Sequence, residues 1–247
     1  MIIKHRSFYS RHLNREMFFR EYGHAGKPMI VFPSSGGSFY EYEDFGMINA
    51  CRPFIDEGSL RIFTPDSLDQ ESWMNESLHP FEKAAKHNKY DAYITQELVP
   101  FIYHNTGWKE KMISTGCSLG AYHAVNFLFR HPNIFDTTIA LSGIYDIRYF
   151  TGNEMNFNIY INSPTDYLKN IEDPWYLDQY RESLIVICCG QGAWEEESIR
   201  DTQHLAHVLR NKNIPAWVDF WGHDVNHDWD WWRIQITYFL NRILHNR

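Results

Sequence analysis

The sequence predicts an α/β protein with a mostly parallel sheet that has helices on both faces. Short runs of apolar and β-branched residues alternate with longer stretches of helical periodicity, which is typical of parallel strands joined by helical crossovers. The 247 residues are 44% hydrophobic, enough apolar side chain for one sizeable core. We therefore expect a single domain over residues 1–247.

Seven runs have the length and composition of strands, and four stretches have that of helices. The predicted strands are 16–22, 29–32, 60–64, 112–115, 137–141, 184–189 and 216–221, and the predicted helices are 92–105, 119–130, 198–210 and 231–244. Glycines and a proline in segment 23–28 separate the first two strands, so an N-terminal antiparallel hairpin is expected there. Residues 148–181 have weak periodicity, which indicates an irregular, cap-like excursion over the sheet.

Composition excludes several classes of partner. A formal net charge of -8 argues against nucleic-acid binding, which needs a basic surface. The chain opens without a signal-peptide pattern and has no uncharged apolar run of bilayer length, so no membrane association is expected. Cysteines 51, 117, 188 and 189 form no disulfide pattern and are interpreted as free thiols of a cytoplasmic protein. Homo-oligomer formation is left open.

The pentapeptide Gly116-Cys117-Ser118-Leu119-Gly120 carries the strongest functional signal. A predicted strand precedes it and a predicted helix follows, which is the context of a nucleophile elbow. Glycines allow the backbone to crowd at this turn, and the serine is exposed at the amino end of the helix. Ser118 is therefore the candidate nucleophile. Cys117 is the rival, but its position in an elbow points away from the reaction site.

The general base is expected after the last strand, because the chain order in such enzymes is serine, acid, histidine. His227 is our candidate, and His223 is expected to support the loop. Two histidines four residues apart would also bind a metal if the segment were helical, but Gly222 and Asn226 disfavour a helix. No metal and no cofactor are therefore expected.

The acid is expected after strand 184–189, where Glu195, Glu196 and Glu197 follow one another. A carboxylate there would orient the histidine and stabilise its imidazolium form. Part of this run complements the dipole of the next helix, so at most one glutamate is catalytic. We favour Glu195.

An oxyanion hole needs two backbone amides. The amide of Leu119 is one candidate, and that of Ser35 or Gly36, in the small-residue loop after strand 29–32, is the other. The aromatic residues Phe39, Tyr40, Trp73 and Trp194 lie on predicted loops near the same rim and are candidates for substrate contact.

With these residues in view, the chain resembles the esterase-D-like "putative esterase" family of α/β-hydrolases, which includes S-formylglutathione hydrolases, feruloyl esterases and mycolyltransferases. The resemblance is carried by segments 32–37, 95–102, 116–120, 163–168 and 227–229. It implies the α/β-hydrolase fold, with Ser118 as nucleophile and His227 as base. Many members have an aspartate as the acid; mycolyltransferases have a glutamate, which favours Glu195.

The expected function is hydrolysis of a small carboxylic ester through a Ser-His-Glu triad and an acyl-enzyme. Acyl transfer to an alcohol or sugar uses the same triad and stays open. A non-catalytic binding protein on a hydrolase fold is the other alternative.

Overall fold

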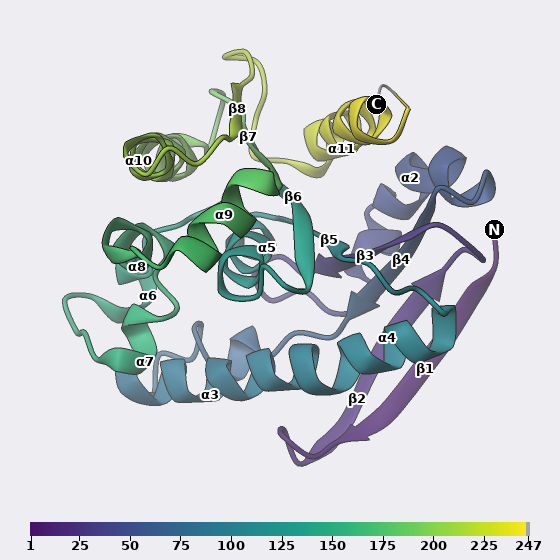
Figure 1. The fold of residues 1–247 in the computed structure, drawn as a ribbon, viewed down its shortest axis with the longest axis horizontal. Coiled ribbons are helices and arrows are strands. Elements are labelled where there is room, and N and C mark those ends of the chain that lie inside the picture. The colour runs from purple at the N-terminus through teal and green to yellow at the C-terminus, as the bar shows by residue number, and fades with distance from the viewer. Residues whose placement is uncertain (246–247) are drawn as a thin grey trace.

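The computed structural model describes residues 1–245 and contains an eight-stranded sheet in the order β1-β2-β4-β3-β5-β6-β7-β8 (Figure 1). Strands from β4 onward in this order pair in parallel, whereas β1 and β2 are antiparallel to their neighbours. The strands are β1 Ile3–Ser10, β2 Arg15–Tyr22, β3 Lys27–Phe32, β4 Leu60–Pro65, β5 Met112–Cys117, β6 Phe135–Leu141, β7 Leu184–Cys189 and β8 Trp217–Phe220. The predicted mostly parallel α/β sheet is confirmed.

The N-terminal antiparallel hairpin exists, but its predicted partners are wrong. β2 pairs with β1 and β4, not with β3. Between β2 and β3 the chain passes very close to the start of β4. The approach is so close that a Cβ on Gly26 would overlap the backbone of Ser59 and Leu60. The sequence prediction missed β1, whose polar and charged run from Lys4 to Ser7 suits an exposed edge strand better than a core strand.

Eleven α-helices are assigned among the described residues. They are α1 Glu41–Asp44, α2 Met47–Asp56, α3 Pro80–Tyr93, α4 Val99–Thr106, α5 Leu119–Arg130, α6 Arg148–Thr151, α7 Phe157–Tyr160, α8 Pro164–Asn170, α9 Pro174–Glu182, α10 Glu196–Asn211 and α11 Trp229–Leu244. The helix predicted at 92–105 is part of a longer one, because α3 continues through the π-helix Ile94–Leu98 into α4. A capping box at His79 and Glu82 starts this helix.

The excursion at 148–181 was predicted to be irregular, and this was wrong. It folds into the four short helices α6 to α9. Their starts are locally encoded: the Asn156 and Asp173 side chains accept backbone N–H groups, and Pro164 and Pro174 occupy first-turn positions. Helices this short show too few turns for hydrophobic periodicity to reveal them.

Two apolar clusters cover the two faces of the sheet. One joins the sheet to α3, α4, α5, α9 and α10, and the other joins it to α2 and α11. Figure 1 shows α2 and α11 together near both chain ends, and α3 to α5 on the other side. Helices therefore cover both faces, as predicted, and the carboxyl ends of the parallel strands carry the loops that form the site.

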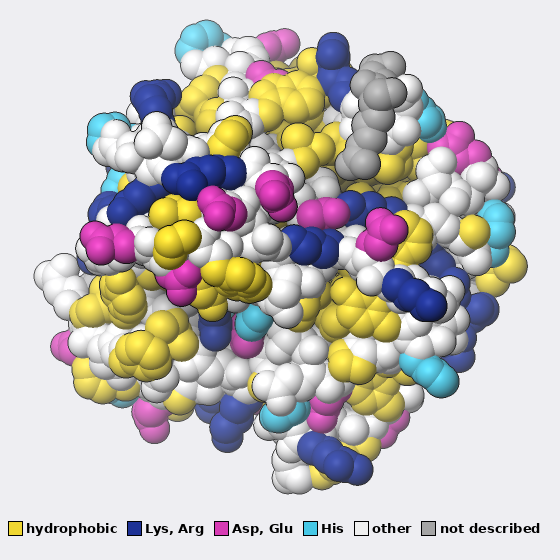
Figure 2. Space-filling view, viewed as in Figure 1, with side chains coloured by type: hydrophobic (Ala, Val, Ile, Leu, Met, Phe, Trp, Pro, Cys, Tyr) yellow, Lys and Arg dark blue, Asp and Glu magenta, His cyan; other side chains and the backbone are white. Residues whose placement is uncertain are grey.

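The exposed surface carries both signs of charge. On the face seen in Figure 2, Lys and Arg side chains are interspersed with Asp and Glu side chains and with apolar patches. None of the helices within residues 1–245 has the length and apolar character needed to cross a bilayer.

Candidate active site

Ser118 sits at a strained turn between β5 and α5. Its φ of 55° and ψ of -122° lie in a region that non-glycine residues rarely adopt. Both flanking glycines are sterically required, because a Cβ on Gly116 would overlap the Gly120 backbone and one on Gly120 would overlap the Phe32 carbonyl. The turn therefore has the crowded backbone expected of a nucleophile elbow, and it leaves Ser118 partly exposed at the amino end of α5.

The ends of neighbouring strands are joined to this turn by backbone hydrogen bonds. The Ser118 amide donates to the Leu141 carbonyl (2.9 Å), and the Ser142 amide donates to the Cys188 carbonyl (2.7 Å). Because parallel strands end at the same edge of a sheet, the residues that follow β5, β6, β7 and β8 lie at one edge. Ser118, Ser142, Glu195 and His227 all belong to these loops.

His227 and Glu195 form a hydrogen-bonded pair, with 3.2 Å between His227 Nδ1 and Glu195 Oε2. A carboxylate only accepts, so Nδ1 carries the proton and Nε2 is left with a free lone pair. Glu195 is fully buried, whereas the His227 side chain remains 20% exposed. Such an imidazole can take a proton from a hydroxyl while the carboxylate stabilises the resulting charge.

The neighbouring glutamates lie elsewhere. Glu196 is exposed in the first turn of α10, and Glu197 forms an ion pair with Arg200 (3.1 Å). Glu195 instead precedes the helix, and its Oε1 accepts hydrogen bonds from Ser142 Oγ (2.6 Å) and the Gly190 amide (3.1 Å). Of the three glutamates, Glu195 is the one placed to orient His227.

The loops after β7 and β8 are pressed together, which brings the acid to the base. A Cβ on Gly190 would overlap the Val225 carbonyl, and one on Gly192 would overlap the Asn226 side chain. The His227 amide donates to the Ala193 carbonyl (3.0 Å), and the Ala193 amide donates to Asn226 Oδ1 (2.8 Å). These contacts fix both backbones next to Glu195.

The loop after β3 holds the other proposed oxyanion donors. Ser35 and Gly36 are exposed, and Gly36 has a φ of 72° that favours glycine. The Glu41 carboxylate accepts two hydrogen bonds from this loop. The Ser34 backbone N–H donates to Oε2 (2.9 Å), and the Ser34 hydroxyl donates to Oε1 (2.7 Å). Burial raises the pKa of Glu41, and the bonds from Ser34 oppose this rise. The Leu119 amide is at the first turn of α5, where N–H groups lack helical partners.

The predicted aromatic rim is only partly correct. Trp73 is buried against Tyr122 and His87 beneath the surface, so its assignment to the substrate rim was wrong. Its loop folds inward because the large indole ring gains more from burial than from exposure. Trp194 is 82% exposed directly before Glu195, and Tyr40 is 43% exposed beside the partly buried Phe39. These three remain candidates for substrate contact.

Two further residues were considered beside the proposed nucleophile and base, namely Cys117 as a rival nucleophile and His223 as a support of the loop. Cys117 is buried, and this burial raises the pKa of its thiol well above the ordinary value. His223 is exposed, and hydrogen bonds from the loop after β7, such as Ala193 N–H to Asn226 Oδ1 (2.8 Å), hold segment 222–227, so the expected supporting role of His223 was wrong. Over residues 1–245, no group of three or more His, Cys, Asp and Glu side chains has the arrangement of a metal site.

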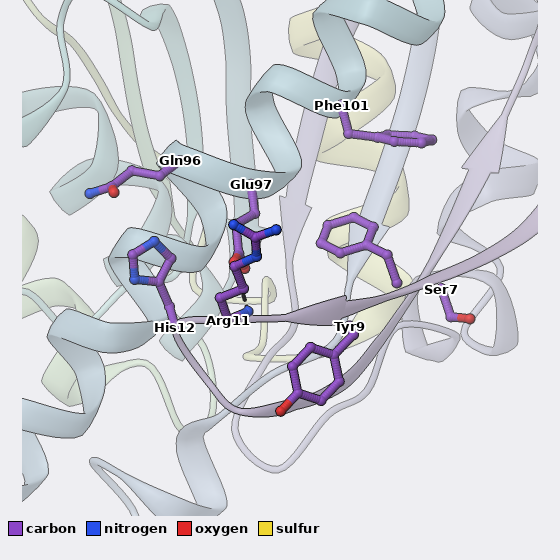
Figure 3. Close-up of a pocket in the computed structure, with 8 residues that line it drawn as sticks. Ser7, Tyr9, Arg11, His12, Gln96, Glu97 and Phe101 are labelled. Carbon is purple, nitrogen blue, oxygen red and sulfur yellow. Dashed lines mark hydrogen bonds between the residues drawn. The ribbon is translucent and has the colours of Figure 1, made fainter.

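Two cavities differ in their relation to this site. One of about 360 Å³ adjoins the loop after β3 and is lined in part by Gly36, Gly37, Ser38 and Asp66. Another of about 590 Å³ lies between β1 and the π-helix (Figure 3). In the second, Glu97 is already bonded to Ser10 Oγ (2.5 Å) and the Arg11 amide (2.8 Å), which fastens the helix to the hairpin. Only the first cavity borders a proposed site residue.

Sequence reasoning missed three residues that support the site, namely Glu41, Ser142 and Trp232. Ser142 and Trp232 lie far apart in the chain, yet the Trp232 indole N–H donates to Ser142 Oγ (3.0 Å). A glutamate in a short loop helix and a serine after a core strand have no local signal of function. The tryptophan five residues after His227 is visible in the sequence, but its partner is not.

Comparisons with known proteins support the fold and the family. The family model described as "Putative esterase" matches residues 21–243. A search of curated proteins found no match. Among solved structures, a ferulic acid esterase is similar with a TM-score of 0.77, 16% identity and coverage of 98% of this chain and 97% of that chain.

Two S-formylglutathione hydrolases are also similar. The enzyme from Agrobacterium tumefaciens has a TM-score of 0.73 and 15% identity, with 97% of this chain and 93% of that chain covered. The enzyme from Staphylococcus aureus has a TM-score of 0.68 and 15% identity, with 99% and 97% covered. These likenesses show the α/β-hydrolase fold, and the family match covers most of the sequence. The chain therefore belongs to this esterase family and is a carboxylic ester hydrolase.

Proposed function

We propose that the protein is a serine esterase in which Ser118, His227 and Glu195 form the catalytic triad. The observation that carries the proposal is the His227–Glu195 hydrogen bond, at the same sheet edge as the strained Ser118 turn. The family match independently supports ester hydrolysis. The substrate is a small molecule with a carboxylic ester bond.

The reaction proceeds in two steps. His227 Nε2 takes the Ser118 proton while the serine oxygen attacks the ester carbonyl, and the alcohol leaves with a proton from His227. Water then attacks the acyl-enzyme with His227 again as base, releasing the acid and restoring Ser118. The amides of Leu119 and of Ser35 or Gly36 stabilise the oxyanion, and Glu195 stabilises the imidazolium.

The test is the substitution Ser118→Ala, measured by hydrolysis of p-nitrophenyl acetate. We expect kcat to fall by about 10⁵-fold, as when the nucleophile of a serine hydrolase is removed. A fluorophosphonate should label wild-type Ser118 and not the variant. Cys117→Ala is the matched control one residue away and should retain activity within about threefold, because a buried thiol takes no part in the triad.

Ser118→Ala with most of the wild-type activity would disprove the assignment. A panel of p-nitrophenyl esters of increasing acyl length, together with a thioester, then defines the pocket. Product analysis with an added alcohol separates hydrolysis from acyl transfer, because a transferase forms a new ester in place of the free acid.

A further inference from the structure

Ser142, the first residue after β6, links the acid Glu195 to the indole of Trp232. Ser142 Oγ lies 2.6 Å from Glu195 Oε1 and 3.0 Å from Trp232 Nε1. An indole N–H only donates and a carboxylate only accepts, so the hydroxyl accepts from Trp232 and gives its single proton to Glu195. The direction of both hydrogen bonds is therefore fixed.

All three groups are removed from water. Ser142 and Glu195 are fully buried, and Trp232 is 4% exposed. Ser142 and the Gly190 amide together occupy Glu195 Oε1, which leaves Oε2 for His227. Hydrogen bonds to a buried charge are strong, and no water replaces one that is deleted. The carboxylate is thus held by one oxygen and acts through the other.

The backbone of Ser142 is strained. Its φ is 53°, a left-handed conformation that is uncommon for a residue with a side chain. It is held there by the bond from its amide to the Cys188 carbonyl (2.7 Å) and by the bond from Ser198 Oγ to its carbonyl (3.0 Å). Strain of this kind persists only when surrounding contacts offset it, and it is often found at functional sites.

Trp232 contacts the histidine as well as the serine. Its ring meets the His227 ring edge to face, with centroids 4.9 Å apart and planes at 81°. The same residue therefore limits the rotation of the imidazole with its ring and orients the Ser142 hydroxyl with its N–H. Trp232 lies in the first turn of α11. From there it contacts His227 directly and Glu195 through the Ser142 hydroxyl.

We propose that Ser142 and Trp232 are positioning residues of the esterase reaction, acting on the triad through Glu195 and His227. The inference rests on the proposed function, because it assigns a role relative to that triad. Loss of the Ser142 hydroxyl leaves the Gly190 amide as the remaining donor to Glu195 Oε1 and loosens the carboxylate, so His227 is less often aligned to accept the Ser118 proton. The effect falls on kcat and leaves substrate binding unchanged.

The experiment compares Ser142→Ala, Trp232→Phe and the double variant in p-nitrophenyl acetate hydrolysis. We expect Ser142→Ala to lower kcat about 10- to 100-fold, the range for a lost hydrogen bond to a buried charge, with KM within about twofold. Trp232→Phe removes the indole N–H and keeps a smaller aromatic ring beside His227, and we expect kcat to fall by about 3- to 10-fold. Because both act through one hydroxyl, the double variant should resemble Ser142→Ala rather than show multiplied losses.

Ser72→Ala is the matched control, since it deletes a fully buried hydroxyl that donates to the Leu68 carbonyl (2.9 Å) and has no hydrogen bond to Ser142, Glu195 or His227. It should keep kcat within about threefold. A kcat for Ser142→Ala within about twofold of wild type, an equal loss in Ser72→Ala, or multiplied losses in the double variant would each overturn the inference. If Ser142→Ala does not fold, as judged by thermal unfolding, Trp232→Phe decides: unchanged kcat overturns the inference. Failure of the proposed function is distinguishable, because wild-type enzyme would then lack activity and Ser118 labelling.

Discussion

Two of the histidine–carboxylate pairs in this molecule have nearly equal lengths but very different surroundings. His227 and Glu195 lie in loops at the carboxyl ends of the strands. The distance from His227 Nδ1 to Glu195 Oε2 is 3.2 Å, and the histidine side chain is 20% exposed. His123 of α5 and Asp69 of the 3₁₀ turn Asp69–Glu71 are 3.0 Å apart, with side chains only 2% and 4% exposed. The buried pair has no route to a substrate, so hydrogen-bond geometry alone does not mark an active site.

The surroundings of His123 are those of a structural contact. Its ring stacks on the ring of His87 with centroids 5.2 Å apart, and its Nδ1 is buried without a partner among residues 1–245. Two elements distant in sequence, α5 and the loop after β4, are joined by this pair. We infer that access at one ring nitrogen, together with a serine at the same sheet edge, separates a catalytic pair from a structural one.

The largest expected contrast is between His227→Gln and His123→Gln. His227→Gln should lower kcat by about 10⁵-fold, because the general base is lost, while thermal stability stays close to wild type. His123→Gln should lower the free energy of unfolding by about 1–3 kcal/mol, because a buried hydrogen bond is weakened, with kcat of the folded enzyme within about threefold. Ester hydrolysis and thermal unfolding of both variants measure this, and a large kcat loss in His123→Gln would contradict the distinction.

The next contrast is between Glu195→Gln and Glu197→Gln. Glu195→Gln should lower kcat by about 10³- to 10⁴-fold, since a neutral amide no longer stabilises the imidazolium or fixes the histidine tautomer. Glu197 contacts Arg200 at the surface, so Glu197→Gln should change kcat by less than about twofold. Steady-state kinetics at one pH decide between them, and equal losses would show that Glu195 is not the acid.

The smallest expected effect concerns the pH dependence of stability near the buried pair. Burial lowers the pKa of His87 well below its ordinary 6.5, so the ring is neutral in the folded protein. The unfolded chain binds the extra proton below about pH 6.5, and the free energy of unfolding therefore falls as the pH drops, by up to about 1.4 kcal/mol per pH unit. Urea unfolding between pH 5 and 7 should show a shallower slope for His87→Leu than for wild type. An unchanged slope would mean that another group causes the dependence.

Much of the proposed site could be derived from the sequence because its signals are local. The elbow at residues 116–120 needs glycines next to one another in the chain, and the order of serine, glutamate and histidine follows from the strand that precedes each residue. The choice of Glu195 among three adjacent glutamates was also predicted, but only the fold shows why it differs. It precedes α10 and turns inward, while Glu196 and Glu197 belong to the first turn of α10, where Glu196 is exposed and Glu197 pairs with Arg200.

Two of the errors concern features that no local pattern encodes. The partner of β2 is set by which strand inserts beside it, and β4 does so from a distant part of the chain. Trp73 lies on a loop, as its sequence suggests, but the loop folds inward over Tyr122. Both outcomes depend on long-range packing, in which residues far apart in sequence compete for the same buried surface.

The sequence by itself determined the α/β class, the elbow at Ser118 and the candidate base, because each depends on residue types at short spacing. Only the tertiary structure decided that Trp232 donates to Ser142 and Ser142 to Glu195, and that the His123–Asp69 pair is shut off from solvent. The physical reason is that these contacts join side chains from segments that follow different strands of the sheet. Their formation depends on the order of strands in the sheet, which periodicity and turn chemistry do not specify.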